Sequence, residues 1–166
     1  VTKFEYDTCD RIVKLVLPDG SYELNTWNDK GQLLEVKRYS AANSLLLRSA
    51  YGYDASSGLL VSVSTFGEGL PTDGIEESFS YDAAGRMVGR TNPNGNQTCW
   101  TYDAGDHLLS MTDACGGVTK FEYSDTGNLI SSTDPLNRKM KYTLSASGKV
   151  LRTDYPDGTA AENEYD

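Results

Sequence analysis

The sequence has no long apolar run and few basic residues. No stretch of about 18 consecutive apolar residues occurs, so the sequence predicts no transmembrane helix. The 24 Asp and Glu residues outnumber 15 Lys and Arg, and the net charge is −9. This balance argues against nucleic acid or an anionic membrane as a partner, because both need a basic surface. We expect the acidity to serve solubility; orientation of a basic guest is the alternative.

Cysteine and histidine are also scarce. The three cysteines, Cys9, Cys99 and Cys115, are odd in number and irregular in spacing. They fit neither a disulfide framework nor paired zinc ligands, so we expect free thiols and no metal site. No helix is predicted, and a glycine-rich phosphate loop between a strand and a helix is therefore absent. The sequence predicts no cofactor.

An aromatic residue, or its replacement, recurs along the whole chain. The spacing is 21 residues in five of seven intervals, and 26 and 28 residues in the two others. The positions are Tyr6, Trp27, Tyr53, Tyr81, Tyr102, Tyr123, Leu144 and Tyr165. Repeats of this length are supersecondary units that bury apolar surface only by stacking on their neighbours.

Turn residues recur in phase with the aromatics. One set follows the aromatic by four or five residues: Asp10, Gly31, Gly58, Gly85, Asp106, Gly127 and Gly148. A second set follows by fourteen: Gly20, Gly95, Gly116, Asn137 and Gly158. Gly, Asn and Asp tolerate the left-handed conformation that closes tight turns. Two turns per unit leave two short strands, so each unit is predicted to be a β-hairpin.

The strand that precedes each aromatic, here called the lead-in strand, alternates in character. The residue two before the aromatic is usually aromatic too, as in Phe4, Phe79 and Phe121, whereas the residues between are mainly polar. Period two places the aromatics on one face and the polar residues on the other, wet face. We expect the aromatics to stack into a ladder across units.

The strand after each aromatic, the return strand, begins with an apolar pair. The pairs are Ile12-Val13, Leu33-Leu34, Leu60-Val61, Met87-Val88, Leu108-Leu109, Leu129-Ile130 and Val150-Leu151. Adjacent residues in a strand point to opposite faces. These pairs therefore predict that both faces are covered near this end of the hairpin.

Candidate catalytic groups are few. His107 lies just after a turn, where other units carry Arg11, Arg86, Asn128 or Lys149, and we interpret it as a solvated histidine. The aspartates that follow the aromatics, such as Asp82 and Asp103, are interpreted as caps of turn amides, as is Asp106 at a turn. Gly67-Glu68-Gly69 falls in an expected loop from Phe66 to Gly74 and indicates only flexibility. We predict no catalytic residues and no enzyme.

Three segments carry a resemblance to a known family: Tyr81-Asp82-Ala83-Ala84-Gly85-Arg86-Met87, Asn92-Pro93-Asn94-Gly95 and Trp100-Thr101-Tyr102-Asp103. Together they resemble the YD repeat of the Rhs family. The resemblance extends over essentially the whole chain and is best over 79–137. Departures are Leu144 for the tyrosine, Ser124 for the aspartate and the irregular stretch 35–80.

The resemblance implies a fold and a role. Rhs, toxin-complex and teneurin-like YD proteins wind β-hairpins into a hollow shell, which in bacterial members encloses a C-terminal toxin. It implies a secreted chain, or one delivered by a secretion system, at the bacterial surface or outside the cell. An adhesive or glycan-binding surface is the alternative, with Trp27, Tyr39 or Trp100 as exposed stacking platforms. Some members cleave themselves at Asp-Pro motifs, but Asp134-Pro135 lacks the expected glycine, and we interpret Asp134 as a turn residue.

The domain prediction is one all-β segment over 1–166, a curved strip of antiparallel hairpins with insertions within 35–80. Both ends fall inside a repeat, since Tyr165-Asp166 begins another unit, so we expect an excerpt of a longer chain. The expected partners are further repeats and an enclosed toxin. The two outer strands are expected to associate edge to edge, the last pairing in phase with the first of another copy.

Overall fold

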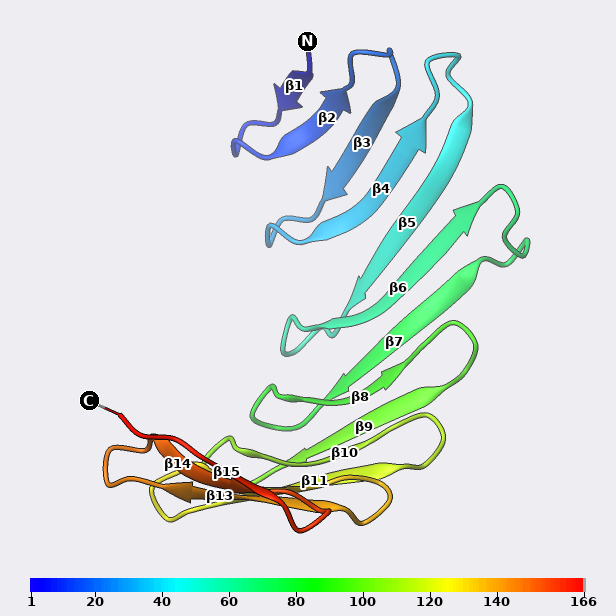
Figure 1. The fold of residues 1–166 in the computed structure, drawn as a ribbon. Helices are drawn as coiled ribbons and strands as arrows, with labels where there is room; N and C mark the ends of the chain where they lie inside the picture. Colours follow the sequence, from blue (N-terminus) through cyan, green and yellow to red (C-terminus); the bar gives the residue numbers. More distant parts are fainter. Residues whose placement is uncertain (166) are drawn as a thin grey trace. The chain divides into compact units, whose positions relative to one another are not determined.

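The structure, a computed structural model, describes residues 1–165; Asp166 lies outside the described residues. This part of the chain is all-β and holds fifteen strands (Figure 1). The strands are β1 Lys3–Tyr6, β2 Ile12–Val16, β3 Tyr22–Trp27, β4 Leu33–Tyr39, β5 Leu45–Tyr53, β6 Leu60–Gly67, β7 Ile75–Tyr81, β8 Met87–Thr91, β9 Gln97–Tyr102, β10 Leu108–Thr112, β11 Val118–Tyr123, β12 Leu129–Thr133, β13 Lys139–Leu144, β14 Val150–Asp154 and β15 Ala160–Glu162. The predicted fold class is confirmed. The described part contains no helix that is long and apolar enough to cross a membrane.

The chain forms two compact units. The first comprises residues 1–86 and 91–95 and contains β1 to β7; the second comprises residues 87–90 and 96–165 and contains β8 to β15 except Thr91. In each unit the order of strands in the sheet is their order in the chain. Neighbouring strands pair antiparallel, for example β1 with β2 and β11 with β12. Each unit is therefore a run of consecutive hairpins.

The turns at the two ends of a hairpin have the same geometry. In the first, the Asp7 amide donates to the Arg11 carbonyl at 3.0 Å and the Asp10 amide donates to the Asp7 carbonyl at 3.2 Å. In the second, the Leu17 amide donates to the Ser21 carbonyl, and the Gly20 amide donates to the Leu17 carbonyl. Asp10 and Gly20 have φ values of 59° and 85°. This is a three-residue hairpin loop closed by a residue in the left-handed region.

The extra residues between 27 and 81 lengthen strands and one loop. β4, β5, β6 and β7 have 7, 9, 8 and 7 residues, whereas lead-in and return strands elsewhere have at most six. A turn at Ser40–Ser44, closed by Asn43 with φ of 64°, joins β4 to β5. The loop between β6 and β7 covers residues 68–74, close to the loop expected from Phe66 to Gly74.

The return strands begin with a β-bulge. Tyr6 lies opposite Ile12 and Glu5 lies opposite Lys14, so Val13 has no partner in the register. The same shift leaves the second residue of the apolar pair unpaired after Trp27, Tyr53, Tyr102, Tyr123 and Leu144. The prediction that both faces are covered here is wrong at Leu34, Leu109 and Leu151, which are 37%, 39% and 39% exposed. A bulge redirects the side chain that it carries.

A conventional core is not found among residues 1–165. Val36 is the one buried large apolar residue, at 8% exposure, and no side chain there is less than 2% exposed. Most strand residues are half-buried. Stability must therefore come from many partial contacts between successive hairpins.

Candidate functional site

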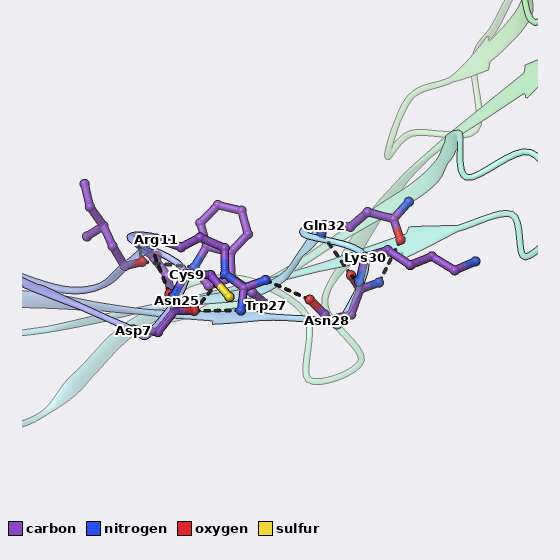
Figure 2. A network of polar contacts seen from close by, with 9 residues as sticks. Asp7, Cys9, Arg11, Asn25, Trp27, Asn28, Lys30 and Gln32 are labelled. Carbon is purple, nitrogen blue, oxygen red and sulfur yellow. Dashed lines mark hydrogen bonds and ion pairs between the residues drawn. The ribbon is translucent and has the colours of Figure 1, made fainter.

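A polar network lies at the hairpin end that carries the repeat aromatic. Figure 2 shows it between the first two hairpins. The Asp7 carboxylate accepts the Cys9 and Arg11 amides through Oδ1, at 2.8 and 3.0 Å, and the Arg11 Nε through Oδ2 at 2.7 Å. The Arg11 guanidinium then reaches the next hairpin, where it donates to the Asn28 carbonyl at 2.9 Å and lies 5.8 Å from the centre of the Trp27 ring.

Other hairpins repeat the cap. Oδ1 of Asp82 accepts the Ala84 and Arg86 amides, and its Oδ2 accepts Arg86 Nε at 2.8 Å. Asn28 accepts the Lys30 and Gln32 amides in the same way. Asp134 caps a turn at the opposite hairpin end and pairs with Arg138, which agrees with its interpretation as a turn residue. The aspartate carboxylates are thus used to close loops.

These hydrogen bonds favour ionised aspartate. The pKa of Asp7 is lowered first by the Arg11 side chain and next by the Arg11 amide. The pKa of Asp82 is lowered by the same two contacts with Arg86. At Asp54 the pKa is lowered chiefly by the hydroxyl of Ser56 and the amide of Ser57. A carboxylate that accepts several N–H and O–H groups binds its proton weakly.

His107 occupies the position that Arg11 and Arg86 occupy in their hairpins. Its Nδ1 lies 2.9 Å from Oδ2 of Asp103, whose Oδ1 caps the turn amides of Gly105 and His107. The ring stacks on Tyr123 of the next hairpin, with centroids 4.7 Å apart and planes inclined by 27°. The side chain is 32% exposed, so His107 is half-buried and keeps part of the contact with solvent that was expected from the sequence. The Asp103 carboxylate and the Tyr123 ring hold the His107 side chain between its own hairpin and the next.

The residue five after the aromatic connects its hairpin to the next in four cases. Arg11 lies over Trp27, His107 on Tyr123, and Lys149 over Tyr165 at 4.8 Å. Gln32 donates to the carbonyl of Gly58 in the following turn at 2.8 Å. We call this side chain the latch; its chemistry varies, but its position does not.

The repeat aromatics make a second connection, through their polar atoms. Five of them donate a hydrogen bond of 2.9 to 3.0 Å to the first carbonyl of the preceding return strand. The pairs are Trp27 to Ile12, Tyr53 to Leu33, Tyr81 to Leu60, Tyr102 to Met87 and Tyr165 to Val150. These bonds join a ring to a backbone carbonyl, whereas the ladder expected from the sequence was a stack of ring on ring. The ring pairs are Phe4–Tyr6, Tyr22–Tyr39 and His107–Tyr123, and none joins repeat aromatics of successive hairpins within 1–165.

The two asparagines that replace the earlier aromatic of the lead-in strand use the same carbonyls. Asn25 Nδ2 donates to the Ile12 carbonyl at 3.3 Å, beside Trp27 (Figure 2). Asn163 Nδ2 donates to the Val150 carbonyl at 3.1 Å, beside Tyr165. A carbonyl oxygen has two lone pairs and can accept both bonds.

The predicted turn residues all lie in loops with positive φ. Gly31, Gly58, Gly85, Gly127 and Gly148 have φ between 74° and 82°. At Gly127 the latch adds a second requirement, because a Cβ there would lie 2.7 Å from His107 Nε2. The turn at Asn43 and both connections between hairpins were not predictable from the repeat pattern. The partner carbonyl lies 15 to 21 residues before its aromatic, and a carbonyl leaves no signal in the sequence.

The suggested stacking platforms are not exposed. Trp27, Tyr39 and Trp100 are half-buried. Trp27 is covered by Arg11, and Tyr39 stacks on Tyr22 with ring centroids 4.8 Å apart. Cys9 and Cys115 are exposed, Cys99 is half-buried, and all three thiols are free. Residues 1–165 contain no group of three or more His, Cys, Asp and Glu side chains that could hold a metal ion.

Comparison with solved structures finds similar chains of low sequence identity. The Tc holotoxin pore of Photorhabdus luminescens, in a TccC3 mutant, is 14% identical with a TM-score of 0.44; the match covers 92% of this chain and 12% of that one. Crystal structures of TcdB2-TccC3-TEV and of TcdB2-TccC3 without the hypervariable C-terminal region are each 15% identical, with TM-scores of 0.37 and 0.38. Both matches cover 93% of this chain and 11% of that one. No curated protein matches the chain.

Comparison with protein families gives four overlapping matches to one repeat. The RHS Repeat model matches residues 53–97, 81–118, 102–139 and 123–160. These ranges together span residues 53–160, which is well over half of the 166 residues. Each range contains a capped turn and its repeat aromatic. The chain therefore belongs to the RHS repeat family.

Proposed function

We propose that this chain is a non-catalytic wall segment of an RHS shell that encloses a C-terminal toxin for delivery in bacterial competition or virulence. The observation that carries the proposal is the in-phase succession of RHS hairpins, of which several are joined to the next by a latch or an aromatic hydrogen bond. The proposed partners are further repeats of the longer protein and the enclosed domain. The proposed location is outside the producing cell, after secretion or delivery.

The chemistry of the hairpin ends supports a structural role. The aspartates that could act as acids or bases accept loop amides, and their pKa values are lowered. General acid–base catalysis near neutral pH instead favours carboxyl groups with raised pKa values. The His107–Asp103 pair occupies the site of the Arg–Asp pairs, so its geometry is explained by the repeat. A thin sheet without a conventional core is well suited to a wall.

Limited proteolysis of the full-length protein tests enclosure. A C-terminal domain inside a shell should resist protease under native conditions and become sensitive when urea unfolds the repeats. The same domain, produced alone, is the control for its own resistance. The proposal would be contradicted if protease cleaved the C-terminal domain within the native full-length protein as fast as it cleaved the isolated domain.

The adhesive or glycan-binding alternative receives no support from the aromatic side chains suggested for it. Trp27 and Tyr39 are already engaged by Arg11 and Tyr22. Stacking of a sugar on Trp27 would first have to displace the guanidinium.

A further inference from the structure

One hairpin of the first unit has the capping aspartate but an apolar residue at the latch position. The Asp54 amide donates to the Leu59 carbonyl at 2.9 Å, as the Asp7 amide donates to the Arg11 carbonyl at 3.0 Å. Leu59 therefore occupies the position of Arg11, directly before the apolar pair of the return strand. Because leucine cannot pair with a carboxylate, this hairpin lacks the ion pair between cap and latch that Asp7 and Arg11 form.

The apolar latch leaves one oxygen of the Asp54 carboxylate unpaired. Oδ1 accepts the amides and hydroxyls of Ser56 and Ser57, at 2.6 to 3.2 Å. Oδ2 has no hydrogen-bond or ion-pair partner among residues 1–165, whereas Oδ2 of Asp7 accepts Arg11. Asp54 is exposed, while Asp7 is half-buried. The Ser56 hydroxyl and the Ser57 amide lower the pKa of Asp54, so its carboxylate is charged at neutral pH.

The aromatic of the next hairpin also lacks a latch on its ring. The Arg11 guanidinium lies 5.8 Å from the centre of the Trp27 ring (Figure 2), and two other latches contact their aromatics in a similar way. Tyr81 is the aromatic that follows Leu59. Its hydroxyl donates to the Leu60 carbonyl at 2.9 Å, but within the described part of the chain no cation or second ring lies on its ring.

A cavity of about 780 Å³ lies between these two hairpin ends. Its lining combines the apolar side chain of Leu59 and the ring of Tyr81 with the carboxylates of Asp54 and Asp82. Asp82 is already paired with Arg86 of its own hairpin, and no basic residue of the described chain lines the cavity. The cavity therefore offers an unpaired carboxylate oxygen beside an uncovered aromatic ring, the two groups that a latch arginine contacts elsewhere in this chain.

The geometry points to this cavity as a binding site for an arginine side chain of another polypeptide segment, with its guanidinium on Oδ2 of Asp54 and against the ring of Tyr81. Arginine suits the site better than lysine, because its planar guanidinium donates two parallel hydrogen bonds to a carboxylate and stacks on aromatic faces. The net charge of −9 also favours a basic partner. We expect weak, salt-sensitive binding, since an exposed ion pair contributes little by itself. The inference does not depend on the proposed function.

Titration with a short arginine peptide tests the site. The probe is acetyl-Gly-Arg-Gly-amide, and the control peptide carries citrulline, which has nearly the shape of arginine but no charge. In nuclear magnetic resonance spectra of the isotope-labelled chain at low salt, the arginine peptide should shift the amide signals of Ser56, Ser57 and Tyr81. The citrulline peptide should bind about tenfold more weakly or less. The absence of these shifts, or equal binding of both peptides, would overturn the proposal.

Matched substitutions separate this site from the general acidity of the chain. Asp54→Asn retains Oδ1 as the cap, as Asn28 does in its turn, but replaces Oδ2 by an amide donor, so the arginine peptide should bind about tenfold more weakly. Asp103→Asn makes the same change of charge at a carboxylate that already pairs with His107, and peptide binding should be unchanged. Unchanged binding to the Asp54→Asn chain, or an equal loss in the Asp103→Asn chain, would refute the role of Asp54.

A third substitution fills the site from within the chain. Leu59→Arg should place its own guanidinium on Asp54 and Tyr81, as Arg11 lies on Asp7 and Trp27. This variant should lose peptide binding and have a raised melting temperature, so loss of binding through unfolding is distinguished from occupation of the site. Retained peptide binding in the Leu59→Arg chain, or a lowered melting temperature, would contradict the proposed position of the guanidinium.

Discussion

Single residues carry two different requirements at the turns. Gly116 and Gly127 both have positive φ, 82° and 79°. Nothing lies within 4 Å of a Cβ built at Gly116, whereas the His107 ring lies 2.7 Å from one built at Gly127. Backbone conformation alone thus explains Gly116, while Gly127 also leaves room for the latch.

Alanine at the two glycines should separate these requirements. A left-handed conformation costs an alanine about 1–2 kcal/mol, so Gly116→Ala should lose about that amount of unfolding free energy in urea titrations. Gly127→Ala should lose more, and His107→Ala in the same chain should remove the excess. A Gly116→Ala chain less stable than the Gly127→Ala chain would be inconsistent with this explanation.

The latch position should accept residues that reach the next hairpin. His107→Arg should retain most of the thermal stability, because arginine makes both contacts at position 11. His107→Ala loses the Asp103 bond and the Tyr123 stack and should lower the melting temperature. Thermal unfolding followed by circular dichroism compares the two variants. Equal melting temperatures for His107→Ala and the unchanged chain would favour the solvated interpretation.

At the scale of elements, hairpins and turns were predictable and their mutual contacts were not. Proline, glycine, asparagine and aspartate set the loops locally, so Gly20 and Gly85 could be placed from the sequence. The turn at Asn43 was missed because it lies between lengthened strands, outside the 21-residue phase. The aromatic hydrogen bonds were missed because each acceptor is a backbone group of another strand.

The capped turns predict a loss of stability in acid. The pKa of Asp82 is lowered by the Arg86 side chain and the Arg86 amide, so the folded chain binds this proton more weakly than the unfolded chain. Its stabilising contribution is therefore complete above the unfolded pKa, near 3.9, and is lost as pH falls below that value. Asp7, Asp103 and Asp134 act in the same direction.

Two substitutions at Asp82 test the cap. Asp82→Asn should keep the amide hydrogen bonds, as Asn28 does in its turn, and lose only the ion pair with Arg86. Asp82→Ala should lose both and be less stable at pH 7. Melting temperatures from pH 2 to 7 should also fall less steeply in acid for Asp82→Asn than for the unchanged chain. If the alanine variant were as stable as the asparagine variant at pH 7, the amide hydrogen bonds accepted by residue 82 would not stabilise the fold.

At the scale of the whole molecule, stability is spread over contacts between neighbouring hairpins. Repeat proteins of this kind gain stability from each unit and from its nearest neighbours. Tyr123, inside the series, is half-buried, whereas Tyr6, on the outer strand β1, is 56% exposed. The position of a residue along the series should then matter as much as its chemistry.

The most direct test is the unfolding free energy of Tyr102→Ala compared with Tyr165→Ala. Both hydroxyls donate to equivalent carbonyls, at 3.0 Å to Met87 and 2.9 Å to Val150, but Tyr102 is half-buried and Tyr165 is 49% exposed. Full burial of an aromatic would give a loss of about 3–5 kcal/mol, so we predict about 2–3 kcal/mol for Tyr102→Ala and about 1 kcal/mol or less for Tyr165→Ala. Leu136→Ala, at a 71% exposed turn residue, should change little. A loss below about 0.5 kcal/mol for Tyr102→Ala, or an equal loss at Tyr165, would contradict a fold held together by its repeat aromatics.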